Sequence, residues 1–308
     1  MSIQVNIQGE IVPPEQAKIS VFDRQFLYGD GIYETLRTFG GRPFLVEGHL
    51  RRLRRSARGI GLSVPWTDEA LILEMNRTLE AAGNSESSVR IILTRGEGEF
   101  GLDPTGIDEP SLVIIVRPLN PVDPRYAREG IDLVIPSVRR TSTQALASHI
   151  KSGNYLNQAM ALAEGRKRGA YEVVMLDGAG NLTEGSTSNV FFVKNGTLYT
   201  PSVAAGVLPG LTRAIVLGLA LQLGIPTERG LYPAEWLFTA DEAFITASIK
   251  ELLPVRRCDD RPIGSTVPGP ITARLLEAYH AITHRAEEGT LKEEETEALL
   301  ESGGGEDG

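Results

Sequence analysis

Hydrophobic and polar residues follow strand and helix periods along the first third of the chain. Residues 3–7 alternate as a strand does, turn at 8–10 and return over 11–12, which predicts a hairpin. Apolar residues recur at helical spacing over 49–60 and 68–82, and a glycine follows each run. Strands are expected at residues 32–39, 43–46, 89–94 and 112–116. Together these elements predict an α+β unit.

A proline-containing stretch of mixed charge interrupts this pattern at residues 118–130. Such a composition is typical of an interdomain linker, so we expect a small N-terminal domain over 1–117 and a larger domain over 131–285. Residues 286–308 are acidic and end in a glycine run, which predicts a disordered tail. In the larger domain we expect strands at 131–135, 172–176, 189–193, 197–200 and 242–246, and helices at 155–169, 212–223 and 270–285.

The composition is that of a globular protein. The 308 residues are 41% hydrophobic and 23% charged, with a formal net charge of -9. No apolar run approaches the roughly 20 residues that cross a bilayer. The N-terminus shows no secretory signal, so we expect a cytoplasmic protein without a membrane segment. A lone Cys258 allows no internal disulfide or cysteine-built metal cage, and the negative charge argues against nucleic-acid partners.

Lysine is scarce in this chain. Of the 31 basic residues only six are lysines. Four of them lie in segments that look solvated: a proline-rich loop, a helix end, a turn and the acidic tail. Lys151 and Lys250 remain as the lysines among residues that could form a pocket.

Two strands carry polar side chains that could bind an anion. Alternation along residues 32–39 places Tyr33, Thr35 and Arg37 on one face, which suggests recognition of an anionic ligand; a solvated outer face is an equal alternative. Arg90 lies in an apolar strand, where an unpaired charge would cost on the order of several kcal/mol. We therefore expect Arg90 to face a carboxylate, either that of Glu34 or that of a substrate.

Three further segments allow either a functional or an ordinary reading. The arginine-rich helix 51–58 could bind nucleic acid, but a solvated amphipathic helix fits the net charge better, and one of its arginines could serve a phosphate. A Pro-Gly turn at 209–210 opens a helix whose first N–H groups could either bind an anion or only cap the helix. Glu184 lies among small residues; it is either a surface carboxylate or the partner of a protonated ring nitrogen.

Six segments in order resemble the branched-chain and D-amino-acid aminotransferase family, the fold type IV pyridoxal-phosphate enzymes. They are 28–34 (YGDGIYE), 49–53 (HLRRL), 151–157 (KSGNYLN), 183–186 (TEGS), 208–213 (LPGLTR) and 248–255 (SIKELLPV). The resemblance covers roughly residues 22–279. It implies a two-domain α+β fold with pyridoxal 5'-phosphate between a small N-terminal and a larger C-terminal domain, and a homodimer or higher homo-oligomer.

The resemblance also implies residue roles. Lys151 would form the Schiff base and carry the substrate proton, which leaves Lys250 without that role. Glu184 would keep the pyridine nitrogen protonated, and Tyr155 would bind the ring oxygen. The phosphate would be bound by Arg52, Leu211, Thr212 and Ser248. The substrate would be bound by Tyr33, Thr35, Arg37, Arg90 and Ile249.

The implied reaction moves an amino group from an L-branched-chain amino acid to 2-oxoglutarate. Arg90 matches the arginine with which branched-chain enzymes bind carboxylates, and the arginine-x-histidine motif of D-specific relatives is absent after Gly96. Ser88, Thr35 and the segment 247–249 depart from the branched-chain pattern. Thr35 also resembles the threonine of 4-amino-4-deoxychorismate lyase, and with Tyr33 it suits D-amino-acid or (R)-amine transaminases. These alternatives remain open.

Overall fold

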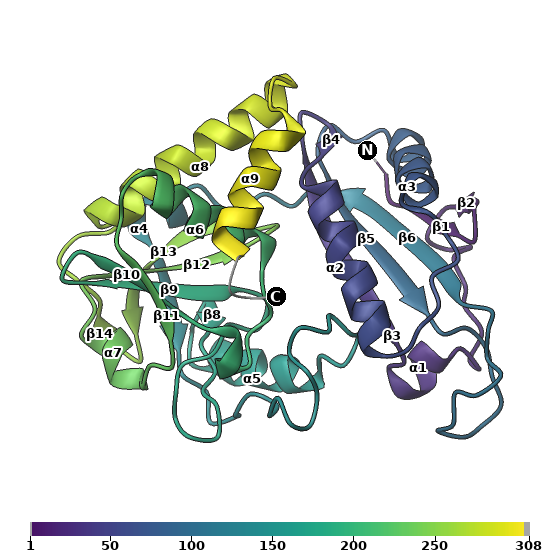
Figure 1. Ribbon diagram of the computed structural model, residues 1–308, viewed down its shortest axis with the longest axis horizontal. Helices are drawn as coiled ribbons and strands as arrows, with labels where there is room; N and C mark the ends of the chain where they lie inside the picture. The colour runs from purple at the N-terminus through teal and green to yellow at the C-terminus, as the bar shows by residue number, and fades with distance from the viewer. Residues whose placement is uncertain (1, 305–308) are drawn as a thin grey trace. The chain divides into compact units, whose positions relative to one another are not determined.

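The computed structural model describes residues 2–304, which form two compact units (Figure 1). Within those residues, unit 1 comprises 2–120, 150–154 and 286–290, and unit 2 comprises 121–149, 155–285 and 291–304. The division after Asn120 falls inside the stretch 118–130 that the sequence marked as a linker. Segment 150–154 belongs to unit 1 although unit 2 precedes and follows it along the chain. The segment that carries Lys151 therefore belongs to unit 1, although the predicted domain boundaries place it in the larger domain.

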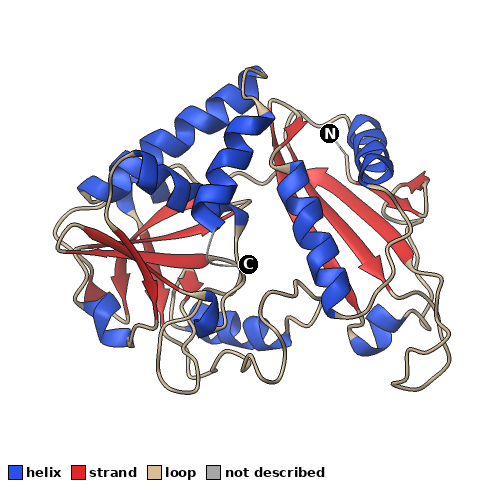
Figure 2. Ribbon diagram, viewed as in Figure 1, coloured by secondary structure: helices blue, strands red, loops and turns tan. Residues whose placement is uncertain are grey.

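Unit 1 is built on a six-stranded antiparallel sheet, drawn in red against blue helices in Figure 2. The strand order is β2-β1-β6-β5-β3-β4. The strands are β1 (Gln4–Ile7), β2 (Glu10–Val12), β3 (Gly31–Phe39), β4 (Arg42–Pro43), β5 (Ser87–Thr94) and β6 (Ser111–Pro118). The helices are α1 (Arg24–Tyr28), α2 (Val46–Gly59) and α3 (Asp68–Ala82).

One face of this sheet forms the core of unit 1. Alternation along β3 points Ile32 and Leu36 to the face on which α2 packs with Leu53 and α3 with Leu71. Full burial of such a side chain contributes about 1.5–3 kcal/mol. Helix α3 begins where the hydroxyl of Thr67 caps it and ends at left-handed Gly83, the glycine that the sequence places after this run. The other face of β3 is left for polar side chains.

Unit 2 contains an eight-stranded mixed sheet of order β11-β10-β9-β12-β13-β7-β8, with β14 paired to β13. Its strands are β7 (Ile131–Val134), β8 (Glu172–Val173), β9 (Asn189–Lys194), β10 (Thr197–Pro201), β11 (Thr227–Gly230), β12 (Glu242–Ala247), β13 (Glu251–Cys258) and β14 (Arg261–Pro262). Its helices are α4 (Arg125–Glu129), α5 (Leu156–Lys167), η1 (Val203–Ala205), α6 (Leu211–Gln222), α7 (Ala234–Phe238), α8 (Pro270–Glu288) and α9 (Glu293–Gly304).

Helix α6 is a largely buried element of unit 2. Nine of its twelve residues are buried, which is typical of a helix enclosed on all sides. The central strands β9 and β12 stack Phe191 on Phe244 with ring centroids 4.9 Å apart. Within residues 2–304, no helix combines the length and the apolar character that spanning a membrane requires.

Several elements differ from the sequence-based expectation. The strand expected at 43–46 is only Arg42–Pro43, because Leu45 adopts a left-handed conformation and α2 begins at Val46. The strand expected at 172–176 pairs only over Glu172–Val173. The long strand β13 was not predicted; it contains Pro254, a residue that sequence patterns rarely allow inside a sheet.

The prediction of a disordered tail over 286–308 is wrong for residues 293–304. Helix α8 continues to Glu288, and α9 follows from Glu293 to Gly304. Leu299 and Leu300 are buried, and three glutamates in the first turn of α9 favour the helix dipole. Residues 305–308 lie outside the described part of the chain. The apolar stripe therefore outweighs the acidic composition that suggested disorder.

Candidate active site

Lys151 faces the side chain of Tyr33 in unit 1. Its Nζ lies 3.4 Å from the hydroxyl oxygen of Tyr33 and 4.5 Å from the centroid of the ring. The backbone around it is bonded to neighbouring elements: Lys151 N–H donates to Ser56 Oγ at 3.0 Å, and the carbonyl of Lys151 accepts from Tyr33 N–H at 3.0 Å. The backbone that carries this amine is therefore fixed from α2 and from β3.

Two glycines allow this close approach. Ile32 and Ser152 form an isolated β-bridge, and Gly153 N–H donates to the carbonyl of Gly31 at 3.3 Å. A Cβ atom on Gly31 or on Gly153 would overlap the side chain of Gln25 from α1. A side chain at either position would therefore require the Gln25 side chain to move from its place beside the Lys151 segment.

The open face of β3 carries the polar residues that alternation placed there. Tyr33, Thr35 and Arg37 share this face, and Arg90 joins them from β5, where it pairs with Thr35. The guanidinium of Arg90 lies 4.6 Å from the Tyr33 ring centroid, and its Nε donates to Thr35 Oγ1 at 3.3 Å. Arg37 turns along the sheet instead, 4.0 Å from the ring centroid of Phe39.

The expectation that Arg90 is buried in an apolar strand needs correction. Arg90 is exposed, so the desolvation cost that demanded a carboxylate partner does not arise. Glu34 is not its partner, because Glu34 points to the opposite face of β3. The neighbours of Arg90 in unit 1 are instead a hydroxyl and an aromatic ring. An exposed guanidinium of this kind suits a carboxylate that arrives from solvent.

Glu34 and Arg52 form a fully buried ion pair on the other face. Arg52 donates through Nε at 2.7 Å and Nη2 at 2.8 Å, and His49 Nδ1 lies 2.7 Å from the same carboxylate. Burial alone would raise the pKa of Glu34, but the charge and hydrogen bonds of Arg52 and His49 hold it far below its usual value. Burial lowers the pKa of His49, and Arg52 and Lys151 lower it further against the effect of Glu34. Glu34 thereby orients the Arg52 guanidinium.

Glu184 in unit 2 is not a surface glutamate. Its side chain is only 9% exposed, and it accepts from Arg140 Nε at 3.0 Å and from Leu208 N–H at 2.8 Å. Backbone bonds with Met175 hold its segment in place. The carboxylate is thus fixed in direction and paired with a nearly buried guanidinium.

Helix α6 begins without a side-chain cap. Gly210 precedes it in an extended conformation and has no side chain that could cap the first N–H groups, which belong to Leu211 and Thr212. A Cβ on Gly210 would overlap the amide of Asn189, whose Nδ2 donates to the carbonyl of Leu208 at 2.9 Å. The helix start therefore presents backbone donors to an anion, as a phosphate requires.

Two buried hydroxyls neighbour Asn189, the residue whose amide lies against Gly210: one is adjacent in the sequence and one is paired across the sheet. Among the described side chains, Ser188 Oγ and Thr246 Oγ1 are buried without a hydrogen-bond partner. Ser188 precedes Asn189 in the chain, and Thr246 pairs with Asn189 between β12 and β9. Unsatisfied buried hydroxyls are uncommon in folded proteins. Together with a fixed carboxylate and an uncapped helix start, they fit a polar, phosphate-bearing group such as pyridoxal phosphate.

Lys250 is held in a different environment from Lys151. Its Nζ lies 2.5 Å from Glu172 Oε2 and 3.1 Å from Thr187 Oγ1. Glu172 is fully buried, and it also accepts from the N–H and the hydroxyl of Ser186. Burial would raise the pKa of Glu172, but the Lys250 charge and these hydrogen bonds lower it. Lys250 therefore neutralises a buried carboxylate.

The residues singled out from the sequence fall into two groups, one in each unit. Unit 1 carries Lys151, Arg52, Tyr33, Thr35, Arg37 and Arg90. Unit 2 carries Tyr155, directly before α5, Glu184, Leu211, Thr212, and Ser248 with Ile249 in the turn between β12 and β13. Sequence reasoning missed Arg140, Ser56 and Glu172. Their contacts lie 44, 95 and 78 residues away, so no local spacing could indicate them.

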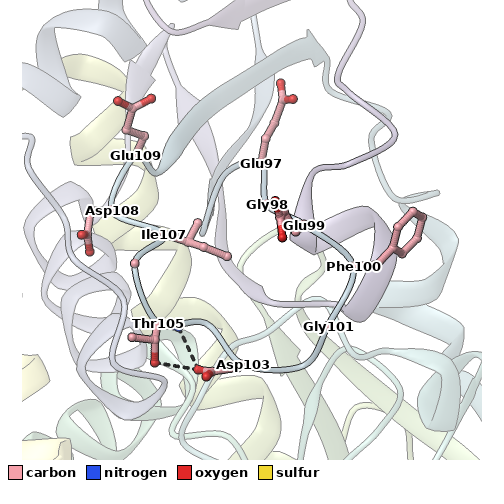
Figure 3. A pocket seen from close by; sticks show the side chains of 11 residues that line it. Glu97, Gly98, Glu99, Phe100, Gly101, Asp103, Thr105, Ile107, Asp108 and Glu109 are labelled. Carbon is pink, nitrogen blue, oxygen red and sulfur yellow. Dashed lines mark hydrogen bonds between the residues drawn. The ribbon is translucent and has the colours of Figure 1, made fainter.

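The loop 97–109 encloses a hollow of about 800 Å³ that has the wrong charge for this chemistry (Figure 3). Its lining includes five carboxylates: Glu97, Glu99, Asp103, Asp108 and Glu109. Thr105 donates to Asp103 Oδ1 through its N–H at 2.9 Å and its hydroxyl at 2.6 Å. A phosphate or a carboxylate would be repelled there, so the basic and helix-start groups described above are the better anion site.

Comparison with known proteins identifies relatives along nearly the whole chain. The sequence model of amino-transferase class IV matches residues 31–258. The Methanocaldococcus jannaschii protein named "Putative branched-chain-amino-acid aminotransferase" is 36% identical over 280 residues, 91% of this chain and 96% of that protein. A D-alanine aminotransferase of Staphylococcus aureus is 33% identical over 90% of this chain and 96% of its own. An aminodeoxychorismate lyase of Bacillus subtilis is 30% identical over 89% and 93%.

Solved structures share the fold. The branched-chain aminotransferase of the archaeon Thermoproteus uzoniensis, solved with norvaline, superposes with a TM-score of 0.86 at 34% identity, covering 94% of this chain and 97% of that one. The T.th. branched-chain amino acid aminotransferase, solved with pyridoxamine 5'-phosphate, gives a TM-score of 0.88 at 28% identity, covering 95% and 98%. The predicted α+β fold type IV architecture is confirmed by these likenesses.

Proposed function

Because this chain belongs to the class IV aminotransferases, enzymes that use pyridoxal phosphate, we propose that it moves the amino group of an L-branched-chain amino acid to 2-oxoglutarate. The observation that carries the proposal is the placement of Lys151. Its amine is held against the hydroxyl of Tyr33, on a segment pinned from two elements of unit 1. An amine in a fixed position is what covalent cofactor attachment and proton transfer at one carbon both require.

The cofactor, when bound, supplies the electron sink that makes the α-proton of an amino acid acidic. Lys151 would hold it through Nζ, and the same nitrogen, released when the amino group of the substrate takes its place, would move the α-proton. Glu184 holds the proton of the ring nitrogen; its carboxylate keeps its direction because Arg140 and the Leu208 amide fix it. Tyr155 binds the ring oxygen.

The phosphate is assigned to the uncapped start of α6 and to two side chains. Leu211 and Thr212 donate through their N–H groups, and Ser248 and Arg52 add a hydroxyl and a charge. The support for Arg52 is its orientation by Glu34, which leaves the guanidinium rigid. Rigid donors lose little conformational entropy when a phosphate binds.

Substrate carboxylates are assigned to the open face of unit 1. Arg90, which rests on Tyr33 and Thr35, pairs with the distal carboxylate of 2-oxoglutarate or glutamate, while Arg37 lines the same face. Ile249 supplies an apolar contact for aliphatic side chains. Branched-chain enzymes among the similar proteins and structures support this choice of donor.

A second function is favoured by Thr35. Its hydroxyl lies on the open face and accepts from Arg90, so it is held beside Tyr33, the neighbour of Lys151. A hydroxyl placed there could relay a proton during elimination from aminodeoxychorismate, or select a D-amino acid or an (R)-amine. Relatives named for D-alanine transfer and for aminodeoxychorismate lyase make this the main alternative.

We further propose that the protein works as a homodimer in the cytoplasm. Unit 1 exposes a set of large apolar side chains, including Phe26 at 65%, Phe100 at 75% and Leu102 at 80%, and Phe100 packs edge-on against Phe22. Apolar groups gathered in this way commonly mark a protein interface. The unpaired thiol of Cys258 suits a reducing compartment. Light scattering should give twice the 33.4 kDa chain mass, and a monomer at micromolar concentration would contradict the dimer.

The choice between donors is tested by single-turnover reactions of the cofactor-loaded protein. L-leucine, D-alanine, (R)-1-phenylethylamine and aminodeoxychorismate are each mixed with the protein, and the change in cofactor absorbance is followed. We expect L-leucine to react fastest and 2-oxoglutarate to regenerate the starting spectrum faster than pyruvate does. A faster reaction with D-alanine or the (R)-amine, or pyruvate release from aminodeoxychorismate, would establish the alternative instead.

A further inference from the structure

Helix α9 packs along α6 within unit 2, and Figure 1 shows the two side by side, α9 in yellow. The helices run in opposite directions, because Leu299 meets Gly218 while Gly303, four residues later, meets Ala214. The last turn of α9 therefore lies against the first turn of α6. That turn contains the N–H groups of Leu211 and Thr212, to which the proposed function assigns the cofactor phosphate.

The two backbones touch at glycines. A Cβ on Gly303 would overlap the carbonyl oxygen of Ala214, and a Cβ on Gly218 would lie 2.6 Å from the carbonyl oxygen of Leu299. Backbone atoms cannot rotate away as a side chain can, so an added methyl group must move one helix relative to the other. The N–H of Ala214 donates to the carbonyl of Gly210 at 2.9 Å, so a shift of Ala214 also displaces Gly210, where α6 starts.

Other contacts keep α9 in this position. Arg285 of α8 binds Glu295 of α9 through two bonds of 2.6 and 2.7 Å. Leu299 and Leu300 are buried. On α6, Arg213 donates through Nη2 to the carbonyl of Pro201 at 3.1 Å and joins the helix to β10. Helix α6 is thus held by the sheet and by α9.

We propose that α9 positions the first turn of α6 for phosphate binding, with Gly303 as the positioning residue. The inference rests on the proposed assignment of the phosphate to Leu211 and Thr212. Hydrogen bonds from backbone N–H groups to an anion depend steeply on distance and angle, so a displacement of a few tenths of an ångström weakens them. Phosphate affinity then depends on helix α9 as well as on the first turn of α6, which carries the donors.

The chain offers a matched pair of variants. Gly303→Ala introduces the overlap with Ala214, whereas a Cβ on Gly304, one residue later in the same helix, meets no atom of residues 2–304 within 4 Å. Both replace a glycine in the last turn of α9 with alanine, so the chemical change is the same. Gly218→Ala produces the same conflict from the α6 side.

The measurement is the affinity of each full-length apoprotein for pyridoxal phosphate and for pyridoxal, which lacks the phosphate, by absorbance titration. We expect Gly303→Ala and Gly218→Ala to weaken pyridoxal phosphate by roughly tenfold, the value of one hydrogen bond to a charged group, relative to Gly304→Ala. Pyridoxal affinity should stay equal among all of them. A merely destabilised fold would lower the melting temperature without this difference between the two ligands.

Several results would overturn the inference. Gly303→Ala and Gly304→Ala could show the same ratio of affinities for pyridoxal phosphate and pyridoxal, or Gly303→Ala could lose affinity for both ligands equally. Either result would show that α9 does not act through the phosphate. If Gly303→Ala does not fold, Leu299→Ala loosens the same contact without an overlap. An unchanged ratio of the two affinities in that variant would overturn the inference as well. If the wild-type protein itself binds the two ligands equally, the phosphate assignment in the proposed function has failed instead.

Discussion

Lys151 in unit 1 and Lys250 in unit 2 each lie close to a serine in the sequence, and folding gives them different partners. Lys151 Nζ faces the hydroxyl and ring of Tyr33, and the backbone on which it stands is bonded to α2 and β3. Lys250 Nζ lies against the carboxylate of Glu172, which is fully buried. An amine beside a phenol can be used for chemistry, whereas an amine that neutralises a buried carboxylate is needed for stability. The partner, more than the local sequence, separates the two roles.

The largest effect is expected for Lys151→Ala. This variant should fold, lose the visible absorbance of bound cofactor on dialysis, and lose activity by on the order of a thousandfold or more, since nucleophile and proton carrier are removed together. Lys250→Ala is the matched control and should retain the absorbance. Retention of chromophore and rate by Lys151→Ala, with loss of both in Lys250→Ala, would reverse the comparison.

A second effect separates the two carboxylates of unit 2. Glu184→Gln removes the charge that is assigned to the ring nitrogen, so the proton-transfer half reaction should slow by on the order of a hundredfold while cofactor affinity changes much less. Glu172→Gln, assayed under conditions where it remains folded, should change the rate of the half reaction by only a small factor relative to wild type. Stopped-flow absorbance measures both. An unchanged rate in Glu184→Gln would return that residue to a structural role beside Arg140.

The Lys250 pair should appear in stability. Lys250→Met leaves the carboxylate of Glu172 buried and unpaired, which should lower the free energy of unfolding by about 2–3 kcal/mol, somewhat less than for a fully buried pair because Lys250 is partly exposed. Lys194→Met, which removes a surface amine bonded to Thr239, should change it by less than about 0.5 kcal/mol. Urea unfolding at neutral pH measures this difference, and equal values for the two variants would contradict the role of the pair.

The pH dependence of that stability has a definite sign. The pKa of Glu172 is lowered in the folded state, so the pair contributes stability above the ordinary carboxyl pKa and loses it as the pH falls toward the lowered value. In Lys250→Met the same carboxyl is buried without its cation, which raises its pKa. Lowering the pH from about 7 to about 5 should therefore stabilise Lys250→Met relative to wild type. A constant difference across that range would show that Glu172 does not titrate.

The smallest effect concerns the open face of unit 1. Arg90→Leu should weaken glutamate and 2-oxoglutarate by roughly tenfold, because a charge-assisted hydrogen bond is lost, and should affect leucine much less. Half-reaction kinetics with both donors measure the difference. Equal losses for glutamate and leucine would assign Arg90 to the α-carboxylate, and no loss for either would leave it as a surface residue stacked on Tyr33.

Period-two alternation predicted which residues share a strand face, but not what lies opposite them. It placed Tyr33, Thr35 and Arg37 together, yet Arg90 joins them only through the pairing of β3 with β5, which depends on the whole sheet. The expected burial of Arg90 failed because this sheet packs helices on one face, and a single strand cannot show which face is open. Long-range partners such as Arg140 have no local signature for the same reason.

The C-terminal segment shows the opposite error, where a signal was present and was overlooked. Thr296, Leu299, Leu300 and Gly303 are buried at the spacing of one helical face. The acidic composition and the terminal glycines suggested disorder, although the glutamates favour the helix start and Gly303 permits the close packing on α6. Pattern was the better guide than composition in this segment.

The central claim, that Lys151 and not Lys250 bears the cofactor, is tested most directly by chemical trapping. Borohydride reduction of the cofactor-loaded protein makes the link between cofactor and amine permanent, and peptide mass spectrometry then locates the added mass. We predict that the phosphopyridoxyl group is found on the peptide containing Lys151. Modification of the peptide containing Lys250, with Lys151 unmodified, would contradict the account.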